Sequence, residues 1–255
     1  MKKTVLALLF IGLCSWGASV KANDWVIKPI EKVKQAAEQG NAEAQYALGL
    51  IYGITGKGDQ TVVWIRKAAE QGLADAQFEL GRNYEITQDF DQAVEWYRKA
   101  AEQGHADAQY SLAVMYEGGA GLTQDYRTAV FWFRKAAEQG LSKAQNSLAA
   151  MYHRGSGVTQ DYRKAVEWFR KAAEQGHALA QMNLGRMYVN GLGVTQDFKM
   201  TYVWFSVSVA NGDVLGGLAA NYRDDTAKKL SPAKLADAQT LAGQYFEKYP
   251  SEPKY

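Results

Sequence analysis

The sequence has almost no cysteine, few histidines and no excess of charge of either sign. Its 255 residues include one cysteine, Cys14, and three histidines. With one cysteine an intramolecular disulfide cannot form, and a cysteine-rich zinc site is excluded as well. The 29 basic and 27 acidic residues nearly balance, which argues against the basic stripe that is typical of nucleic-acid-binding proteins.

Long apolar runs are also absent, and the nearest approach to one lies at the start of the chain. A membrane-spanning helix needs about 20 predominantly apolar residues. Residues 5–20 are mostly apolar, but they are fewer than that and are interrupted by Gly12, Ser15 and Gly17. The segment therefore favours a cleaved secretory signal over a membrane anchor.

Residues 1–22 have the three parts of a secretory signal, which are a charged start, an apolar core and an end with small residues. Lys2 and Lys3 supply the charge, and Val20 and Ala22 are small enough for signal peptidase. We predict cleavage near Ala22, a periplasmic or secreted protein, and no transmembrane segment in the mature chain.

Cleavage would change the cysteine content and the charge of the protein. Cys14 would leave with the signal, and acylation as a lipoprotein is not expected because Leu13, not a small residue, precedes it. Removing Lys2, Lys3 and Lys21 from the 29 basic residues leaves 26 against 27 acidic ones, a net charge of −1. The mature protein is expected to be free of disulfides, so its stability must come from packing.

The rest of the chain contains a repeated sequence motif. The heptapeptide RKAAEQG occurs at residues 66–72, 98–104, 134–140 and 170–176. The repeat glycines are spaced by 32, 32, 36, 36 and 36 residues and are Gly40, Gly72, Gly104, Gly140, Gly176 and, in a weaker copy, Gly212. Eight residues before each of the last five lies a tryptophan, namely Trp64, Trp96, Trp132, Trp168 and Trp204. Fixed periods of 20–50 residues indicate a solenoid.

Each repeat divides into two predicted helices, of which the first is helix A and the second helix B. In residues 105–119 the apolar residues of helix A recur at helical spacing and share one face. These residues are Ala108, Leu112, Met115 and Tyr116. Within residues 123–140, helix B begins after Asp125, a favourable N-cap residue, and ends before Gly140, where a left-handed residue stops a helix.

Helix B is predicted to bury its aromatic and small side chains. The buried residues are Ala129, Trp132, Phe133 and Ala136. Arg134 and Glu138 lie four residues apart on the exposed side and are expected to form a pair worth a few tenths of a kcal/mol. The motif RKAAEQG is thus predicted to form the last turn of helix B and the glycine that ends it.

Together these positions resemble the Sel-1-like repeat (SLR), a relative of the tetratricopeptide repeat (TPR). The shared pattern is Ala-Gln, Leu-Gly, Tyr, Gly-x-Gly-Val, Asp-Tyr, Trp-Phe and Lys-Ala-Ala-Glu-Gln-Gly, clearest at residues 141–176 and extending from Glu31 to Gly212. The resemblance implies an all-α, right-handed α/α superhelical solenoid of about five helix-turn-helix repeats that serves as an adaptor or scaffold. The loops at 53–59 and 85–88 are four residues short, so these repeats should turn more tightly.

The two ends are predicted to cap the array. Residues 23–40 supply one N-terminal helix, residues 41–212 the repeats, and residues 213–255 a degenerate repeat, a final helix and a short tail. Ser231 at the N-cap, followed by Pro232, is a favoured start for that final helix. Terminal units of a solenoid are expected to be atypical and more polar outside.

An enzymatic interpretation has one motif behind it. Ser231 and Lys234 fit the Ser-x-x-Lys pattern of β-lactamases and penicillin-binding proteins, and some cysteine-rich SLR proteins have been described as binding or hydrolysing β-lactams. The Ser-Asp-Asn and Lys-Thr-Gly partners of the motif are missing from the sequence. A β-lactam- or peptidoglycan-directed hydrolase is therefore the alternative, whereas a protein without catalytic residues is the prediction.

No cofactor or metal site is predicted. Three glycine-rich loops lack the preceding strand and the following Lys-Ser/Thr of a phosphate-binding loop, and they occupy residues 117–122, 153–158 and 189–194. His105 and His177 follow repeat glycines at a position that varies between repeats, so they are expected to be exposed. His153 lies beside Arg154 at a helix end, where a cation is favoured.

The predicted function is non-enzymatic binding of a protein or peptide in the cell envelope, by a protein expected to be a monomer. In helix A, the positions three, seven and ten after the repeat glycine share one face but differ between repeats, unlike the packing positions. We call this the A-helix face and predict that it lines the concave side and binds the partner, although a merely solvated role is an equal alternative. Its candidate residues, acidic first and more basic later, are Glu43, Leu50, Asp75, Glu79, Arg82, Asp107, Ser111, Lys143, Ser147, Asn183 and Arg186.

Overall fold

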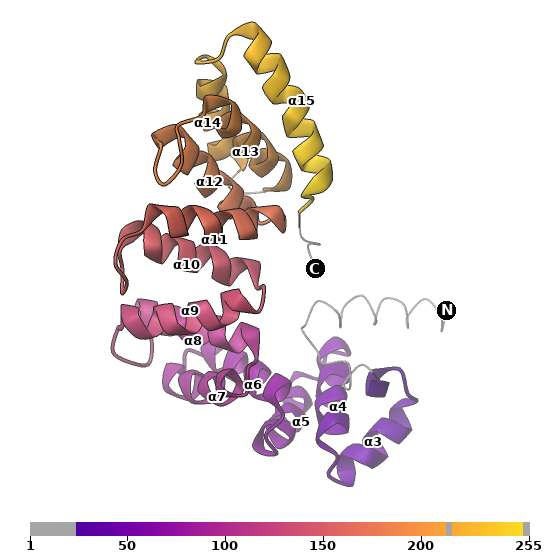
Figure 1. The fold of residues 1–255 in the computed structure, drawn as a ribbon. Helices are drawn as coiled ribbons and strands as arrows, with labels where there is room; N and C mark the ends of the chain where they lie inside the picture. Colours follow the sequence, from indigo (N-terminus) through magenta and orange to yellow (C-terminus); the bar gives the residue numbers. More distant parts are fainter. Residues whose placement is uncertain (1–23, 213–215, 252–255) are drawn as a thin grey trace. The chain divides into compact units, whose positions relative to one another are not determined.

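The computed structural model describes residues 24–212 and 216–251, and every regular element in those ranges is an α-helix (Figure 1). The predicted all-α fold is thus confirmed. The predicted signal, residues 1–22, lies outside the described residues. The chain forms two compact units, the first ending at Gln124 and the second beginning at Asp125.

The helices alternate between the two predicted types. The first unit contains α3 (Ile30–Glu38), α4 (Ala42–Ile54), α5 (Gly58–Glu70), α6 (Ala74–Ile86), α7 (Phe90–Glu102) and α8 (Ala106–Gly118). The second contains α9 (Tyr126–Glu138), α10 (Ser142–Arg154), α11 (Tyr162–Glu174), α12 (Ala178–Asn190), α13 (Phe198–Asn211), α14 (Gly216–Ala227) and α15 (Pro232–Lys248). Helices α4, α6, α8, α10 and α12 are A helices, and α5, α7, α9, α11 and α13 are B helices.

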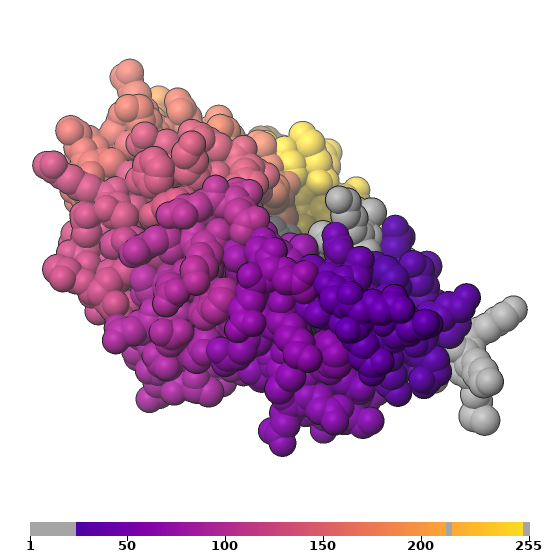
Figure 2. Space-filling view, turned by 90° about the horizontal axis from the view of Figure 1, so that it is seen from below, coloured from indigo at the N-terminus to yellow at the C-terminus, as the bar shows by residue number. Residues whose placement is uncertain are grey.

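Within each unit, a helix packs mainly against its neighbours in the chain. The space-filling view therefore shows the sequence colours in successive bands rather than intermixed (Figure 2). Such local packing is the property that defines a repeat array, because each repeat buries its apolar face against the next one.

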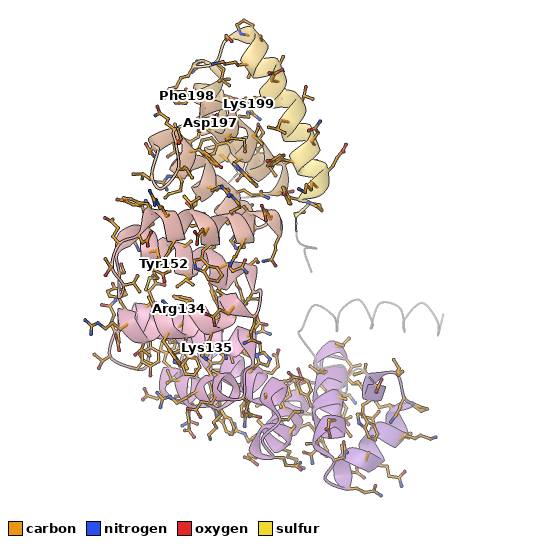
Figure 3. The ribbon with its side chains drawn as sticks, in the orientation of Figure 1. Arg134, Lys135, Tyr152, Asp197, Phe198 and Lys199 are labelled. Atoms are coloured by element: carbon orange, nitrogen blue, oxygen red, sulfur yellow. The ribbon has the colours of Figure 1, made fainter. Side chains whose placement is uncertain are left out.

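The repeat glycines stop the helices as predicted. Gly40, Gly72, Gly104, Gly140 and Gly176 have φ angles between 86° and 96°, a conformation that side chains other than glycine rarely adopt. The weaker sixth copy, Gly212, has a φ of −101° instead. At the opposite ends, Asp125 caps α9 as predicted, and Asp197 caps α13 by accepting from the Lys199 backbone N–H at 2.8 Å (Figure 3).

The glutamines of the repeat form hydrogen bonds that link successive repeats. The Gln77 amide donates to the carbonyl of Ala69 at 3.1 Å and accepts from the side chain of Gln103 at 2.7 Å. The same pair of bonds is made at Gln45, Gln145 and, with Asn211 as the donor, Gln181. Buried polar groups must find such partners, so the glutamine of RKAAEQG does more than end a helix.

The arginine of the RKAAEQG motif also contacts the next repeat. Arg134 Nη2 donates to the hydroxyl of Tyr152 on α10 at 2.9 Å (Figure 3). Equivalent bonds join Arg98 to Tyr116 at 3.2 Å and Arg170 to Tyr188 at 3.0 Å. Arg134 and Glu138 are both exposed, as predicted, but the guanidinium of Arg134 bonds to Tyr152 of the next repeat instead of pairing with Glu138.

Three of the repeat tryptophans, Trp64, Trp132 and Trp168, are only half-buried, whereas Trp96 is 8% exposed and belongs to the core. In α9, Phe133 is fully buried, Trp132 is half-buried and Phe131 is 52% exposed. Three other tryptophans have the ammonium of the lysine three residues later about 4 Å above the ring, in the pairs Trp64–Lys67, Trp96–Lys99 and Trp168–Lys171. Such cation–π contacts suit rings at the edge of a core.

Trp204 is more deeply buried than Trp96, because the final helix covers it. Tyr245 and Tyr249 at the end of α15 pack on its ring with centroid distances of 5.2 and 6.0 Å. Its exposed fraction is 2%. Helix α15 therefore closes the apolar end of the second unit.

The glycine-rich loops pack against the backbone of the preceding repeat. A methyl group at Gly157 would lie 2.3 Å from the carbonyl oxygen of Tyr126, and one at Gly193 would lie 2.3 Å from that of Tyr162. These glycines leave room for the backbone at the first residues of α9 and α11. The short loops of residues 55–57 and 87–89 replace the longer ones of residues 119–125, 155–161 and 191–197, as expected.

Candidate functional site

The A-helix face is partly closed in the first repeat. Glu43 is half-buried, whereas Leu50 is fully buried in a core cluster that includes Val33 and Ala37 of α3. The prediction that Leu50 belongs to a binding face was wrong. In this repeat an apolar residue at the tenth position packs into the core instead of facing a partner.

Helix α6 places a closed ion pair on the A-helix face. Arg82 Nη1 donates to both carboxylate oxygens of Glu79 at 3.1 and 3.2 Å. Glu79 is only 8% exposed, so it is not the open acidic contact that the sequence suggested. Burial raises the pKa of the Glu79 carboxyl, and the charges of Arg82 and His105 oppose this shift.

His105 has a structural role that was not predicted from the sequence. Its Nδ1 accepts from the Ala108 backbone N–H at 3.2 Å and thereby caps α8. Its ring stacks on Phe78 with a centroid distance of 4.6 Å, and Nε2 lies 3.5 Å from Oδ1 of Asp75. With its side chain only 10% exposed, it is not the exposed histidine that was predicted.

His177 is likewise half-buried and caps α12, where its Nδ1 accepts from the Ala180 backbone N–H at 3.2 Å. Asn41 at the same repeat position caps α4 by accepting from Ala44 at 2.8 Å. The signal was present in the sequence, because asparagine is a preferred N-cap residue and shares this position with both histidines.

The remaining predicted residues of the first unit lie on α8. Asp107 and Ser111 are half-buried, and Val114, at the tenth position after the repeat glycine, is 39% exposed. Together with half-buried Glu43 and Asp75, they leave an acidic but only partly accessible A-helix face in this unit.

In the second unit the A-helix face is polar and more basic. Lys143 and Ser147 of α10 are half-buried, as is Asn183 of α12, and Arg186 is exposed. The amide of Asn183 donates to Oδ1 of Asn146 at 3.2 Å and joins α12 to α10. Both A helices therefore contribute to one continuous surface.

A cavity of about 260 Å³ lies on this surface among α10, α11 and α12. Phe169 and Met187, which are 3% and 2% exposed, form its apolar wall. His153, Arg154, Asn183 and Arg186 supply its polar lining. Burial lowers the pKa of the His153 imidazole, and the charges of Arg186 and Arg154 lower it further.

The Ser-x-x-Lys motif occupies a helix start. Ser231 is exposed, and its Oγ accepts from the Lys234 backbone N–H at 3.4 Å, so it is the predicted N-cap of α15. In the parts of the chain that the structure describes, no group of three or more potential metal ligands converges. None of the described helices is long and apolar enough to span a membrane.

If Ser231 only caps α15, Ser231→Ala should lower the free energy of unfolding by about 1 kcal/mol, as loss of an N-cap usually does. Urea unfolding followed by circular dichroism measures this change. Neither protein should react with a fluorescent penicillin, and labelling that disappears in Ser231→Ala would identify Ser231 as a nucleophile.

Five consecutive segments match the family model of the Sel1 repeat, and they are residues 42–73, 74–105, 106–141, 142–177 and 178–213. Their bounds follow the helix pairs, since each segment begins at the first residue of an A helix. No curated protein matches the chain.

Solved structures with the same fold include two with clear sequence similarity. A protective antigen present in uropathogenic Escherichia coli strains, which displays an SLR fold, is 39% identical with a TM-score of 0.77, over 85% of this chain and 48% of the antigen. A Sel1 repeat protein from Oxalobacter formigenes is 36% identical with a TM-score of 0.66, over 75% of this chain and 58% of that protein. The chain therefore spans about half the length of these relatives.

A more distant structure is similar in fold alone. A TPR protein with an unusual peptide-binding site is 18% identical with a TM-score of 0.51, over 76% of this chain and 99% of that protein. None of these three proteins is named as an enzyme.

Proposed function

Because this chain belongs to the Sel1 repeat family, and is thus a TPR-like repeat scaffold, we propose that it is an exported, non-enzymatic protein that binds an extended peptide segment of a partner on its A-helix face. The observation that carries the proposal is the second unit, where two A helices share a polar surface with a cavity of about 260 Å³. Pockets with an apolar wall and a few polar groups are the usual form of ligand sites.

The surface chemistry supports a peptide as the ligand. Side chains on the A-helix face differ between repeats, whereas the glutamine, glycine and alanine positions that hold the array together are repeated. Packing therefore leaves the face free to acquire specificity. A solenoid suits an extended ligand, because equivalent positions recur along its length.

The test is selection of dodecapeptides from a random display library on the protein made from the full 255-residue sequence. We expect peptides that bind with micromolar affinity, and we expect Arg186→Glu to weaken them at least tenfold, or by about 1.4 kcal/mol. Lys135→Glu on the B helix α9 (Figure 3) is the matched control and should leave affinity unchanged. Circular dichroism spectra and melting temperatures should agree for all three proteins.

Two outcomes would contradict this assignment. Failure to select any peptide would argue against peptide binding altogether. Peptides that tolerate Arg186→Glu but lose affinity with Lys135→Glu would move the contact to the B-helix face. Glu79→Lys is a poor probe of the same face, because breaking the buried pair with Arg82 would itself destabilise the fold.

Export is supported by the charged start, apolar core and Val20-x-Ala22 end of the sequence. The intact mass of protein recovered from a cell-envelope fraction should correspond to a chain that begins at Asn23. A mass that still includes Met1 would show that residues 1–22 are retained.

A further inference from the structure

The cavity among α10, α11 and α12 has the chemistry of a carboxylate site, and we infer that it receives the side chain of an aspartate or glutamate in the bound peptide. This inference rests on the proposed function, since it assigns one ligand group within the same A-helix face. Its evidence is a difference between two repeats at equivalent positions.

The seventh and tenth positions after the repeat glycine are Glu79 and Arg82 in one repeat, and Asn183 and Arg186 in another. In α6 the carboxylate of Glu79 accepts two bonds from Arg82 at 3.1 and 3.2 Å, which satisfies the guanidinium within the helix. In α12 asparagine replaces that glutamate, and its amide donates to Asn146 instead. Across residues 24–212 and 216–251, no carboxylate pairs with Arg186.

One wall of the cavity is polar and adds positive charge. His153 and Arg154 line it from α10, and Arg186 lines it from α12. The Arg154 guanidinium lies 3.3 Å from the sulfur of Met151, which holds it at this wall. Both arginines bring positive charge to the cavity, and burial together with these charges lowers the pKa of His153. Arginine forms paired hydrogen bonds with carboxylates.

The apolar wall favours a carboxylate that is carried on an aliphatic stem. Phe169 and Met187 present carbon and sulfur surface inside the cavity, and water would be displaced from this surface by methylene groups. A free inorganic anion has no such stem. The A-helix face also continues past the cavity to Ser147 and Lys143 on α10, so a peptide lying across it need not end there. Both features favour an acidic side chain over a chain terminus.

The experiment uses the tightest dodecapeptide from the selection, acetylated at its N-terminus and amidated at its C-terminus. Variants of this peptide, each with one aspartate changed to asparagine or one glutamate changed to glutamine, are compared with the original peptide by fluorescence anisotropy. For one position we expect at least a tenfold loss of affinity with the wild-type protein. The Asn183→Glu variant should bind the original peptide at least tenfold more weakly, because its new carboxylate would occupy Arg186 as Glu79 occupies Arg82.

Asn183→Gln is the matched control, because it keeps an amide and adds no charge, and it should bind within about threefold of wild type. With Asn183→Glu, the acidic peptide and its amide version should bind equally. Lys135→Gln on α9, an exposed residue outside the A-helix face, should leave the preference for the acidic peptide unchanged. Melting temperatures identify any variant whose fold has changed.

The results separate the two proposals. Peptides that bind equally well as acid and amide, with no effect of Asn183→Glu, would overturn the carboxylate site and leave peptide binding intact. A requirement for a free C-terminal carboxylate would also overturn the assignment to a side chain. If no peptide can be selected, both proposals fail.

Discussion

Replacing Phe133 with alanine is expected to lower the free energy of unfolding by about 3–5 kcal/mol, the usual cost of removing a buried aromatic side chain. Phe133 is fully buried in α9. The surrounding side chains can relax only partly, so the change would leave a cavity. Urea unfolding followed by both circular dichroism and tryptophan fluorescence would measure the loss.

Two neighbours in the same helix provide the control series. Phe131 is 52% exposed and Trp132 is half-buried, so Phe131→Ala should cost less than about 1 kcal/mol and Trp132→Ala an intermediate amount. The three variants remove aromatic rings from consecutive positions and therefore differ mainly in burial. A larger loss for Trp132→Ala than for Phe133→Ala would mean that the tryptophans carry the core after all.

The order of these three effects could not be obtained from the sequence. Trp132 and Phe133 are adjacent, about 100° apart around the helix axis, and both fall within a wide apolar stripe. Which of them points to the centre of the core depends on the angle at which the helices cross. By contrast, the helix ends were predictable, because Asp125 and Gly140 act through their own backbone and side-chain geometry.

The candidate site was predictable in position but not in accessibility. Counting from the repeat glycine located the A-helix face, since equivalent residues occupy equivalent places in each repeat. The same count could not show that Leu50 is covered or that Glu79 is paired within its own helix. Burial depends on what packs against a helix, and this differs between the first repeat and the later ones.

The cavity of the second unit was not predicted for a related reason. Its lining combines His153 and Arg154 at the end of α10 with Arg186 of α12 and Phe169 of α11. Arg186 and Asn183, which also lines the cavity, lie at varied positions that defined the A-helix face. His153, Arg154 and Phe169 are separated from them in the sequence and meet them only when the helices stack.

The second large loss of stability is expected from a substitution in a loop between helices. Gly157→Ala should lower the free energy of unfolding by about 2–4 kcal/mol. Gly157 has a φ of 71°, where an alanine is strained, and its new methyl group would lie 2.3 Å from the carbonyl oxygen of Tyr126. The backbone of α9 would have to move to accept it. Urea unfolding by circular dichroism measures the change.

Gly140→Ala separates the two contributions to this cost. Gly140 has a φ of 96°, but a methyl group there would meet no atom within 4 Å. It should therefore cost only the conformational strain of about 1–2 kcal/mol. A loss at Gly157 no larger than that at Gly140 would mean that the loop moves away from Tyr126 at little cost. A clearly larger loss would show that the glycine-rich loops hold successive repeats together through close backbone contact.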